Sequence, residues 1–98
     1  MFVPGIVLQE LLSGTRSAAH RRRLEEIVEG FEVRTASVED HRMAATIRDA
    51  CRQEGIAAAA IDCLITAQVI RADARLFTLD RDFDRIATVS SLRLLEVP

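Results

Sequence analysis

Apolar residues recur every three or four positions through the first third of the chain, a spacing that places them on one face of a helix. The pattern predicts a turn at Pro4-Gly5, then a short helix over Ile6 to Ser13 that ends at Gly14. A second helix is predicted from Ser17, a good N-cap residue, to Gly30. The apolar positions of these two helices are Val7, Leu8, Leu11 and Leu12, then Leu24, Ile27, Val28 and Phe31.

The pattern changes to a period of two at Phe31 to Thr35, which indicates a strand with one solvated face. Ser37 and Asp40 then have the spacing of a capping box, with Asp in place of the usual Glu or Gln. The helix that they start is predicted to end before Gly55. Its inward positions are Ala44, Ile47, Ala50 and Cys51.

The second half of the chain alternates helix and strand. The segment Ala60 to Ala72 is apolar nearly all round, which favours a buried helix, and Leu76 to Leu79 is typical of a parallel strand covered on both faces. A helical turn at Asp82 to Ala87 and a last strand at Leu92 to Val97 follow. We therefore expect an α/β fold with a mainly parallel sheet and flanking helices, as a single domain over residues 1–98.

Composition removes several classes of function. All 13 positive charges are arginine, which excludes a Walker-type phosphate loop and Schiff-base chemistry, because both need lysine. The net charge of −2 argues against a general binder of polyanions. Cys51 and Cys63 are too few for a metal site, so we expect reduced, buried, inert thiols in a cytoplasmic protein. We expect neither a signal peptide nor a membrane span.

Two carboxylates are predicted to meet at one edge of the sheet. Asp62 lies in the first turn of the buried helix, and Asp80 directly follows the next strand. Because a helix that returns into a parallel sheet runs antiparallel to its next strand, both reach the carboxyl edge, where open α/β folds place their sites. Asp82 is close enough in sequence to join them.

Carboxylates gathered in one pocket repel each other unless a cation neutralises them. An all-oxygen set suits a hard ion such as Mg²⁺ or Mn²⁺, which can activate water for attack on a phosphodiester. Each residue alone also has a structural interpretation. Asp62 favours a helix N-terminus, Leu79 to Asp82 could be a strand exit with a helix cap, and Glu10 could be a solvated surface residue.

Other polar features have ordinary structural explanations. His20 and His41 have no second ligand at metal spacing, and we expect both on exposed helix faces. The run Arg21 to Arg23 is expected to be a solvated face paired with nearby glutamates, with contact to an RNA backbone as the alternative. The run Ala57 to Ala60 is expected to pack tightly at the start of the buried helix.

Three segments in order resemble motifs of PIN-domain proteins, with VapC-like toxins of bacterial toxin–antitoxin pairs as the most similar group. The segments are Val7-Leu8-Gln9-Glu10-Leu11-Leu12-Ser13-Gly14, Ile61-Asp62-Cys63-Leu64-Ile65-Thr66-Ala67 and Thr78-Leu79-Asp80-Arg81-Asp82-Phe83. The resemblance implies an endoribonuclease dependent on Mg²⁺ or Mn²⁺, with Glu10, Asp62 and Asp80 as catalytic acids. Asp82 would join them as a metal ligand, and Thr78 would be a hydroxyl residue that contacts substrate.

The resemblance also implies an RNA substrate, a cognate antitoxin and a dimer. The family's first strand, which ends in an Asp, and the helix after it have no counterpart before the Glu10 motif. The expected domain is thus an N-terminally truncated PIN-like fold with impaired activity. The alternative is a catalytically inactive remnant that serves as an assembly or antitoxin-binding module. Because Leu76 to Leu79 would lack one neighbouring strand, we expect a homodimer or higher oligomer with a large apolar interface.

Overall fold

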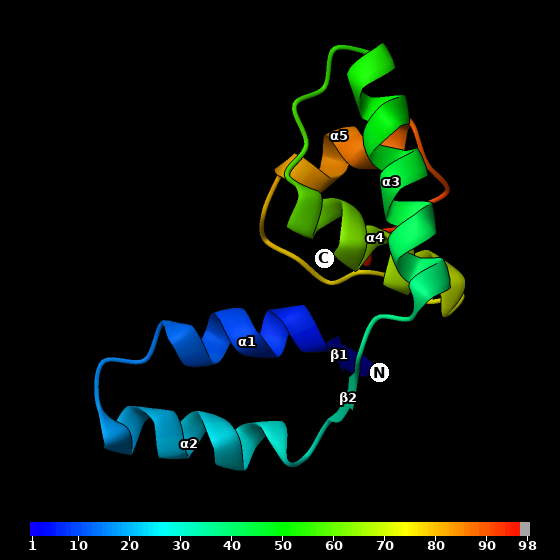
Figure 1. Ribbon diagram of the computed structural model, residues 1–98. Coiled ribbons are helices and arrows are strands. Elements are labelled where there is room, and N and C mark those ends of the chain that lie inside the picture. The colour runs from blue at the N-terminus through cyan, green and yellow to red at the C-terminus, as the bar shows by residue number, and fades with distance from the viewer. Residues whose placement is uncertain (97–98) are drawn as a thin grey trace. The chain divides into compact units, whose positions relative to one another are not determined.

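The computed structural model describes residues 1–96, which form two compact units: one spans Met1–Ala36 and the other begins at Ser37 (Figure 1). Helices connect short strands along the chain, and every strand pairing described in residues 1–96 is parallel. The α/β class with a mainly parallel sheet is thereby confirmed. The single domain over residues 1–98 stays a prediction, and residues 97–98 lie outside the described part of the chain.

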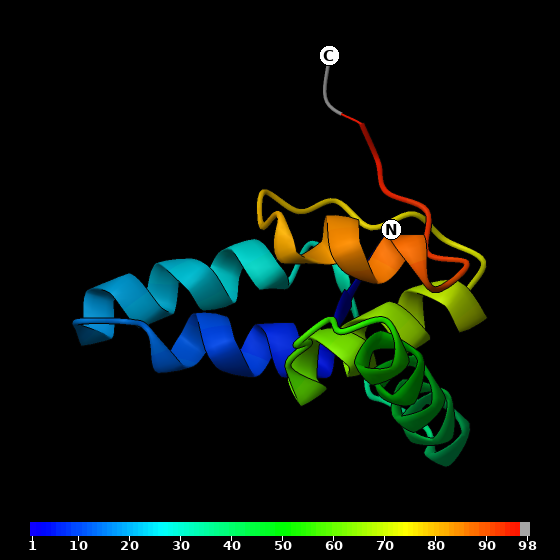
Figure 2. The same cartoon turned by 90° about the horizontal axis from the view of Figure 1, so that it is seen from above.

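The first unit is a pair of parallel strands joined by two helices. Val3 lies opposite Val33 in the register of the strands. The two connecting helices lie side by side and run in opposite directions (Figures 1 and 2). The elements in chain order are β1 (Phe2–Pro4), α1 (Gly5–Ser13), α2 (Ala18–Val28) and β2 (Glu32–Arg34).

The observed boundary at Ser17 agrees with the one predicted from the sequence, and the one at Pro4 differs. Ser17 caps α2 as predicted, since its Oγ accepts a hydrogen bond from the backbone N–H of His20 at 3.0 Å. The turn expected at Pro4-Gly5 is wrong: Pro4 ends a strand and is the N-cap of α1. Three residues are too few for an alternating pattern to be visible, and proline is acceptable at a strand end because it need not donate to the ladder there.

The second unit is built from three helices, α3 (Val38–Gln53), α4 (Ala60–Arg71) and α5 (Asp82–Thr88). Helices α3 and α4 pack on each other through Cys51 and Cys63, which are 0% and 1% exposed. Both cysteines are free, as expected, and burial raises the pKa of the Cys63 thiol, which keeps it protonated and inert. Within residues 1–96, every helix is too short or too polar to cross a membrane.

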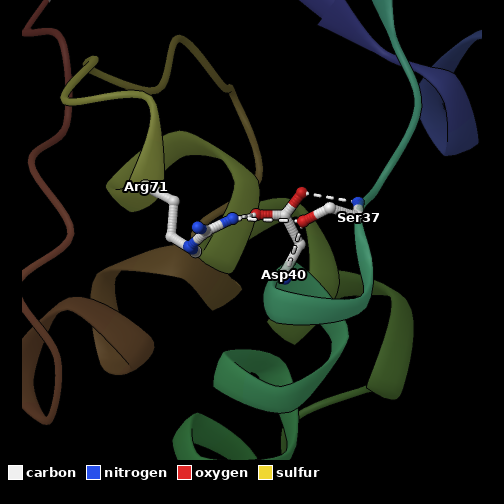
Figure 3. Close-up of polar contacts among 3 residues, drawn as sticks. All are labelled: Ser37, Asp40 and Arg71. Carbon is white, nitrogen blue, oxygen red and sulfur yellow. Dashed lines mark hydrogen bonds and ion pairs between the residues drawn. The ribbon is translucent and has the colours of Figure 1, made fainter.

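An ion pair joins the start of α3 to the end of α4 (Figure 3). The predicted capping box is present: Ser37 Oγ accepts from the N–H of Asp40, and Asp40 Oδ2 accepts from the N–H of Ser37 at 2.8 Å. Asp40 Oδ1 also accepts from Arg71 Nη1 at 2.9 Å, across 31 residues of sequence. The local capping signal is therefore part of a tertiary contact as well.

The loop after α3 begins with a left-handed residue. Gly55 has φ +73, and its N–H donates to the carbonyl of Arg52 at 3.0 Å. The N–H of Ile56 donates to the carbonyl of Cys51 at 2.8 Å. These two bonds form a Schellman motif, in which glycine adopts the positive φ without steric cost. The motif ends α3 and directs the chain into the segment that leads to α4.

The two strands predicted in the second unit are much reduced. In the part of this unit that the structure describes, residues 37–96, they form one parallel bridge, between Leu76 and Leu94, with the N–H of Leu76 donating to the carbonyl of Arg93. Phe77 and Leu79 are 59% and 86% exposed, so the prediction of a strand buried on both faces is wrong. A strand is buried only where neighbours cover it, and the last segment contacts this one at a single bridge. Val97, at the end of the second predicted strand, lies outside the described residues.

Candidate metal centre

Asp62 is held in the first turn of α4, where its carboxylate interacts favourably with the helix dipole. The N-cap residue, Ala59, provides no side-chain hydrogen bond to this helix end. Thr66, which is fully buried, donates its hydroxyl to the carbonyl of Asp62 at 2.8 Å. The backbone of Asp62 is therefore fixed to the core, while its side chain is half-buried.

Asp80 and Asp82 are positioned by a run of local hydrogen bonds. The N–H of Asp80 donates to Thr78 Oγ1 at 3.0 Å, and the N–H of Asp82 donates to Asp80 Oδ1 at 2.9 Å. Asp82 is the first residue of α5, a helix that Phe83 and Ile86 anchor in the core at 5% and 1% exposure. The turn and the buried helix face together fix where both carboxylates lie.

The three carboxylates meet as the sequence predicts. One oxygen from each of Asp62, Asp80 and Asp82 lies within 4.8 Å of the other two. Ligand oxygens of an octahedral Mg²⁺ are about 3 Å apart when adjacent and about 4.2 Å apart when opposite, so the three carboxylates would have to draw closer together to share one ion.

The electrostatics of the cluster favour a bound cation. Burial, then the negative charges of Asp80 and Asp82, raise the pKa of the Asp62 carboxyl. A divalent cation would relieve this repulsion, and an all-carboxylate set suits a hard ion better than zinc or copper. The residues therefore fit a hard divalent cation.

Glu10 is the one predicted acid outside this cluster. It lies on α1 in the first unit and is exposed, whereas the three aspartates belong to the second unit. Its place among the metal ligands stays a prediction. His20 and His41 are both exposed, as expected for surface residues.

A cavity of about 110 Å³ adjoins the carboxylates, and sequence reasoning missed it. Asp62 and Asp82 form part of its wall, and Arg85, Ile86 and the segment before α4 form the rest. The tight packing expected for the alanine run is wrong, because Ala57, Ala59 and Ala60 are exposed. The available signal was the spacing of Asp82 and Arg85, since residues three apart share a helix face.

Comparison with known proteins agrees with this geometry. The PIN domain family model matches residues 1–89. Ribonuclease VapC11 of Mycobacterium tuberculosis and VapC ribonuclease Mb1587 of Mycobacterium bovis are each 37% identical over 89 residues, which cover 89% of this chain. The chain spans 66% of the length of these curated relatives.

A solved structure supports the fold independently. The crystal structure of VapBC2 from Rickettsia felis bound to a DNA fragment from their promoter matches with a TM-score of 0.81. The match covers 96% of this chain and 72% of that chain at 23% identity, so it shows the fold alone. The family match over residues 1–89, the relatives and the cluster of carboxylates lead to one conclusion: the chain belongs to the PIN-domain family.

Proposed function

We propose that this PIN-domain chain is a divalent-metal-dependent endoribonuclease that acts in the cytoplasm as the VapC-like toxin of a toxin–antitoxin pair. The observation that carries the proposal is the convergence of Asp62, Asp80 and Asp82 at one point. Relatives named as VapC ribonucleases support the choice of RNA as substrate.

Each site residue has a defined part in the proposed reaction. Asp62, Asp80 and Asp82 would hold Mg²⁺ or Mn²⁺, and Glu10 is proposed as a further catalytic acid and ligand from α1. The bound cation would lower the pKa of a water molecule and neutralise charge on the phosphate. Thr78 accepts the N–H of Asp80 and keeps its own hydroxyl proton, which it can donate to a phosphate oxygen of the RNA.

The proposal predicts that RNA cleavage requires a divalent ion. Single-stranded RNA incubated with the protein should be cut in the presence of Mg²⁺ or Mn²⁺ and left intact when EDTA is in excess. The Asp80→Asn variant, which keeps the shape of the side chain and loses its charge, should be inactive with either ion. Cleavage that survives both EDTA and this substitution would contradict the proposal.

The alternative is a catalytically inactive PIN-domain remnant that serves as an assembly or antitoxin-binding module. A cognate antitoxin is proposed as the protein partner on the basis of the family. A well-folded wild-type protein that binds an antitoxin, and leaves RNA intact with either metal ion, would favour the remnant over the enzyme.

We also propose a homodimer or higher oligomer. Exposed apolar side chains on the segments around the Leu76–Leu94 bridge support it: Phe77, Leu79 and Leu95 are 59%, 86% and 48% exposed. A second copy of the chain would cover these apolar side chains. Light scattering at micromolar concentration should give a mass at least twice that of the 10.9 kDa chain. A folded monomer would contradict this assembly.

A further inference from the structure

The cavity beside the carboxylates has the size and lining of a small anion site. Its volume of about 110 Å³ is enough for several water molecules or for one phosphate group. Three small side chains, those of Ala57, Ala58 and Ala59, form part of its lining. Asp62 and Asp82 also line the cavity, so whatever binds here lies beside the metal centre.

Arg85 supplies the positive charge of this cavity. It lies three residues after Asp82 on α5, so the two side chains share a helix face and line the same space. Among residues 1–96, Arg85 makes no ion pair, although two carboxylates line the cavity with it. Arginines that do pair with carboxylates in that part of the chain are Arg21, Arg34, Arg42, Arg52, Arg71 and Arg93.

The chemistry of this arrangement suits a phosphodiester. A phosphate that approaches the aspartates is repelled by their negative charge. A bound divalent ion would offset only part of this repulsion, because the cluster has three carboxylates. The Arg85 guanidinium group, which lines the same cavity, provides a second positive charge. Its planar fork of N–H donors matches two phosphate oxygens at once.

We propose that the cavity is a phosphate-binding subsite in which Arg85 holds a backbone phosphate of an RNA strand next to the metal centre. The choice of RNA as ligand rests on the proposed function. Arg85 is exposed, so its replacement leaves the core of the second unit intact.

RNA binding can be measured separately from cleavage. Fluorescence anisotropy with a labelled single-stranded RNA in Ca²⁺, a hard ion for carboxylate oxygens, gives Kd as a function of salt. Arg85→Gln should weaken binding about tenfold and reduce the salt dependence by about one phosphate contact. Arg85→Lys should retain the salt dependence and recover part of the affinity, since lysine keeps the charge without the fork.

Arg75→Gln is the matched control, because Arg75 is exposed, makes no ion pair among residues 1–96 and does not line the cavity. Its RNA affinity should stay within about twofold of wild type, as should the Mn²⁺ affinity of Arg85→Gln measured by calorimetry. An unchanged affinity and salt dependence in Arg85→Gln would overturn the inference, and so would an equal loss in Arg75→Gln.

The subsite and the proposed enzyme can fail separately. A wild-type protein that binds RNA through Arg85 but leaves it uncut supports the subsite and contradicts the nuclease. A protein that cuts RNA with the same KM and kcat in the wild type and in Arg85→Gln overturns the subsite and supports the nuclease. A wild-type protein that neither binds nor cuts RNA overturns both.

Discussion

Replacing Asp62 with asparagine is expected to lower Mn²⁺-dependent RNA cleavage at least about 100-fold, since changes even in the groups that support a metal ligand cost 10–100-fold. Asparagine matches aspartate in shape but lacks the negative charge and the second carboxylate oxygen. Of the three clustered acids, Asp62 is the least exposed and lies on α4, whereas Asp82 begins α5 and Asp80 lies just before it. Its loss should therefore leave Asp80 and Asp82 unable to fix the ion.

The same substitution should leave the fold intact. Burial and the charges of Asp80 and Asp82 raise the pKa of Asp62, so its charged form is disfavoured in the folded protein. Removing that charge relieves the repulsion among the three carboxylates. This gain offsets the loss of a favourable helix-dipole interaction of about 0.3–1 kcal/mol. Circular dichroism and urea unfolding in EDTA should match wild type within about 1 kcal/mol.

Asp84→Asn provides the control for the Asp62 prediction. Asp84 lies on α5, two residues from Asp82, and is outside the carboxylate cluster. Its cleavage rate should stay within about threefold of wild type, as expected for a surface change. If Asp62→Asn retained more than a tenth of the wild-type rate, or if both variants lost activity equally, the three carboxylates would not form the active centre.

Replacing Arg71 with methionine is expected to lower the free energy of unfolding by about 2 kcal/mol. Asp40 is 7% exposed, and Arg71 is the partner of its Oδ1, so the substitution leaves a buried carboxylate oxygen without that donor. The bonds to Ser37 remain, and the Arg71 side chain is 39% exposed. These two features keep the expected loss below that of a fully buried pair.

The Asp40–Arg71 pair should also make the free energy of unfolding depend on pH. Burial raises the pKa of Asp40, but the hydrogen bonds from the Ser37 backbone and Arg71, together with the charge of Arg71, outweigh it and hold the pKa below its usual value. The stabilisation is thus present above the unfolded pKa of about 3.9 and is lost as the pH falls through the folded pKa. Arg71→Met should reduce this loss at acid pH.

Arg52→Met is the control for the Arg71 prediction. Arg52 forms an ion pair with Asp49 at 3.1 Å, but both side chains are more than 60% exposed. Such pairs contribute about 0–1 kcal/mol. Urea unfolding followed by circular dichroism at neutral and acid pH compares the two variants. Equal losses, or an unchanged acid response in Arg71→Met, would contradict the role given to the Asp40–Arg71 pair.

Local signals in the sequence predicted most helix boundaries correctly. Ser17 and Ser37 cap the helices that they were expected to start, and Gly14 and Gly55 mark the ends expected for α1 and α3. These boundaries depend on hydrogen bonds between residues a few positions apart. The sequence alone is sufficient to predict them, because no distant partner is needed.

The candidate metal centre was also predictable, although the strand expected between Asp62 and Asp80 is not formed. The sequence predicts that Asp62 and Asp80 lie close together because a helix should run back along a buried strand. The strand is only a bridge at Leu76, yet the carboxylates meet. Their position follows from the first turn of α4 and the buried face of α5, whose Phe83 was visible in the sequence only as part of a motif.

Features that need distant partners were not predictable in the same way. The contact of Arg71 with Asp40 spans 31 residues, and nothing near either residue indicates it. The strand at Phe2–Pro4 exists only through its pairing with Glu32–Arg34. Phe77 and Leu79 are exposed, and whether an apolar side chain is buried likewise depends on which distant segments cover it. A pattern of apolar residues does not specify those segments.

The position of a bound Mn²⁺ ion tests the central claim most directly. Crystals of the protein soaked in Mn²⁺ should give an anomalous scattering peak within about 2.5 Å of carboxylate oxygens from Asp62, Asp80 and Asp82. Crystals of Asp62→Asn treated in the same way should show a weaker peak or none. Well-diffracting wild-type crystals with no peak at these carboxylates, at a Mn²⁺ concentration that supports RNA cleavage, would contradict the claim that they form the metal centre.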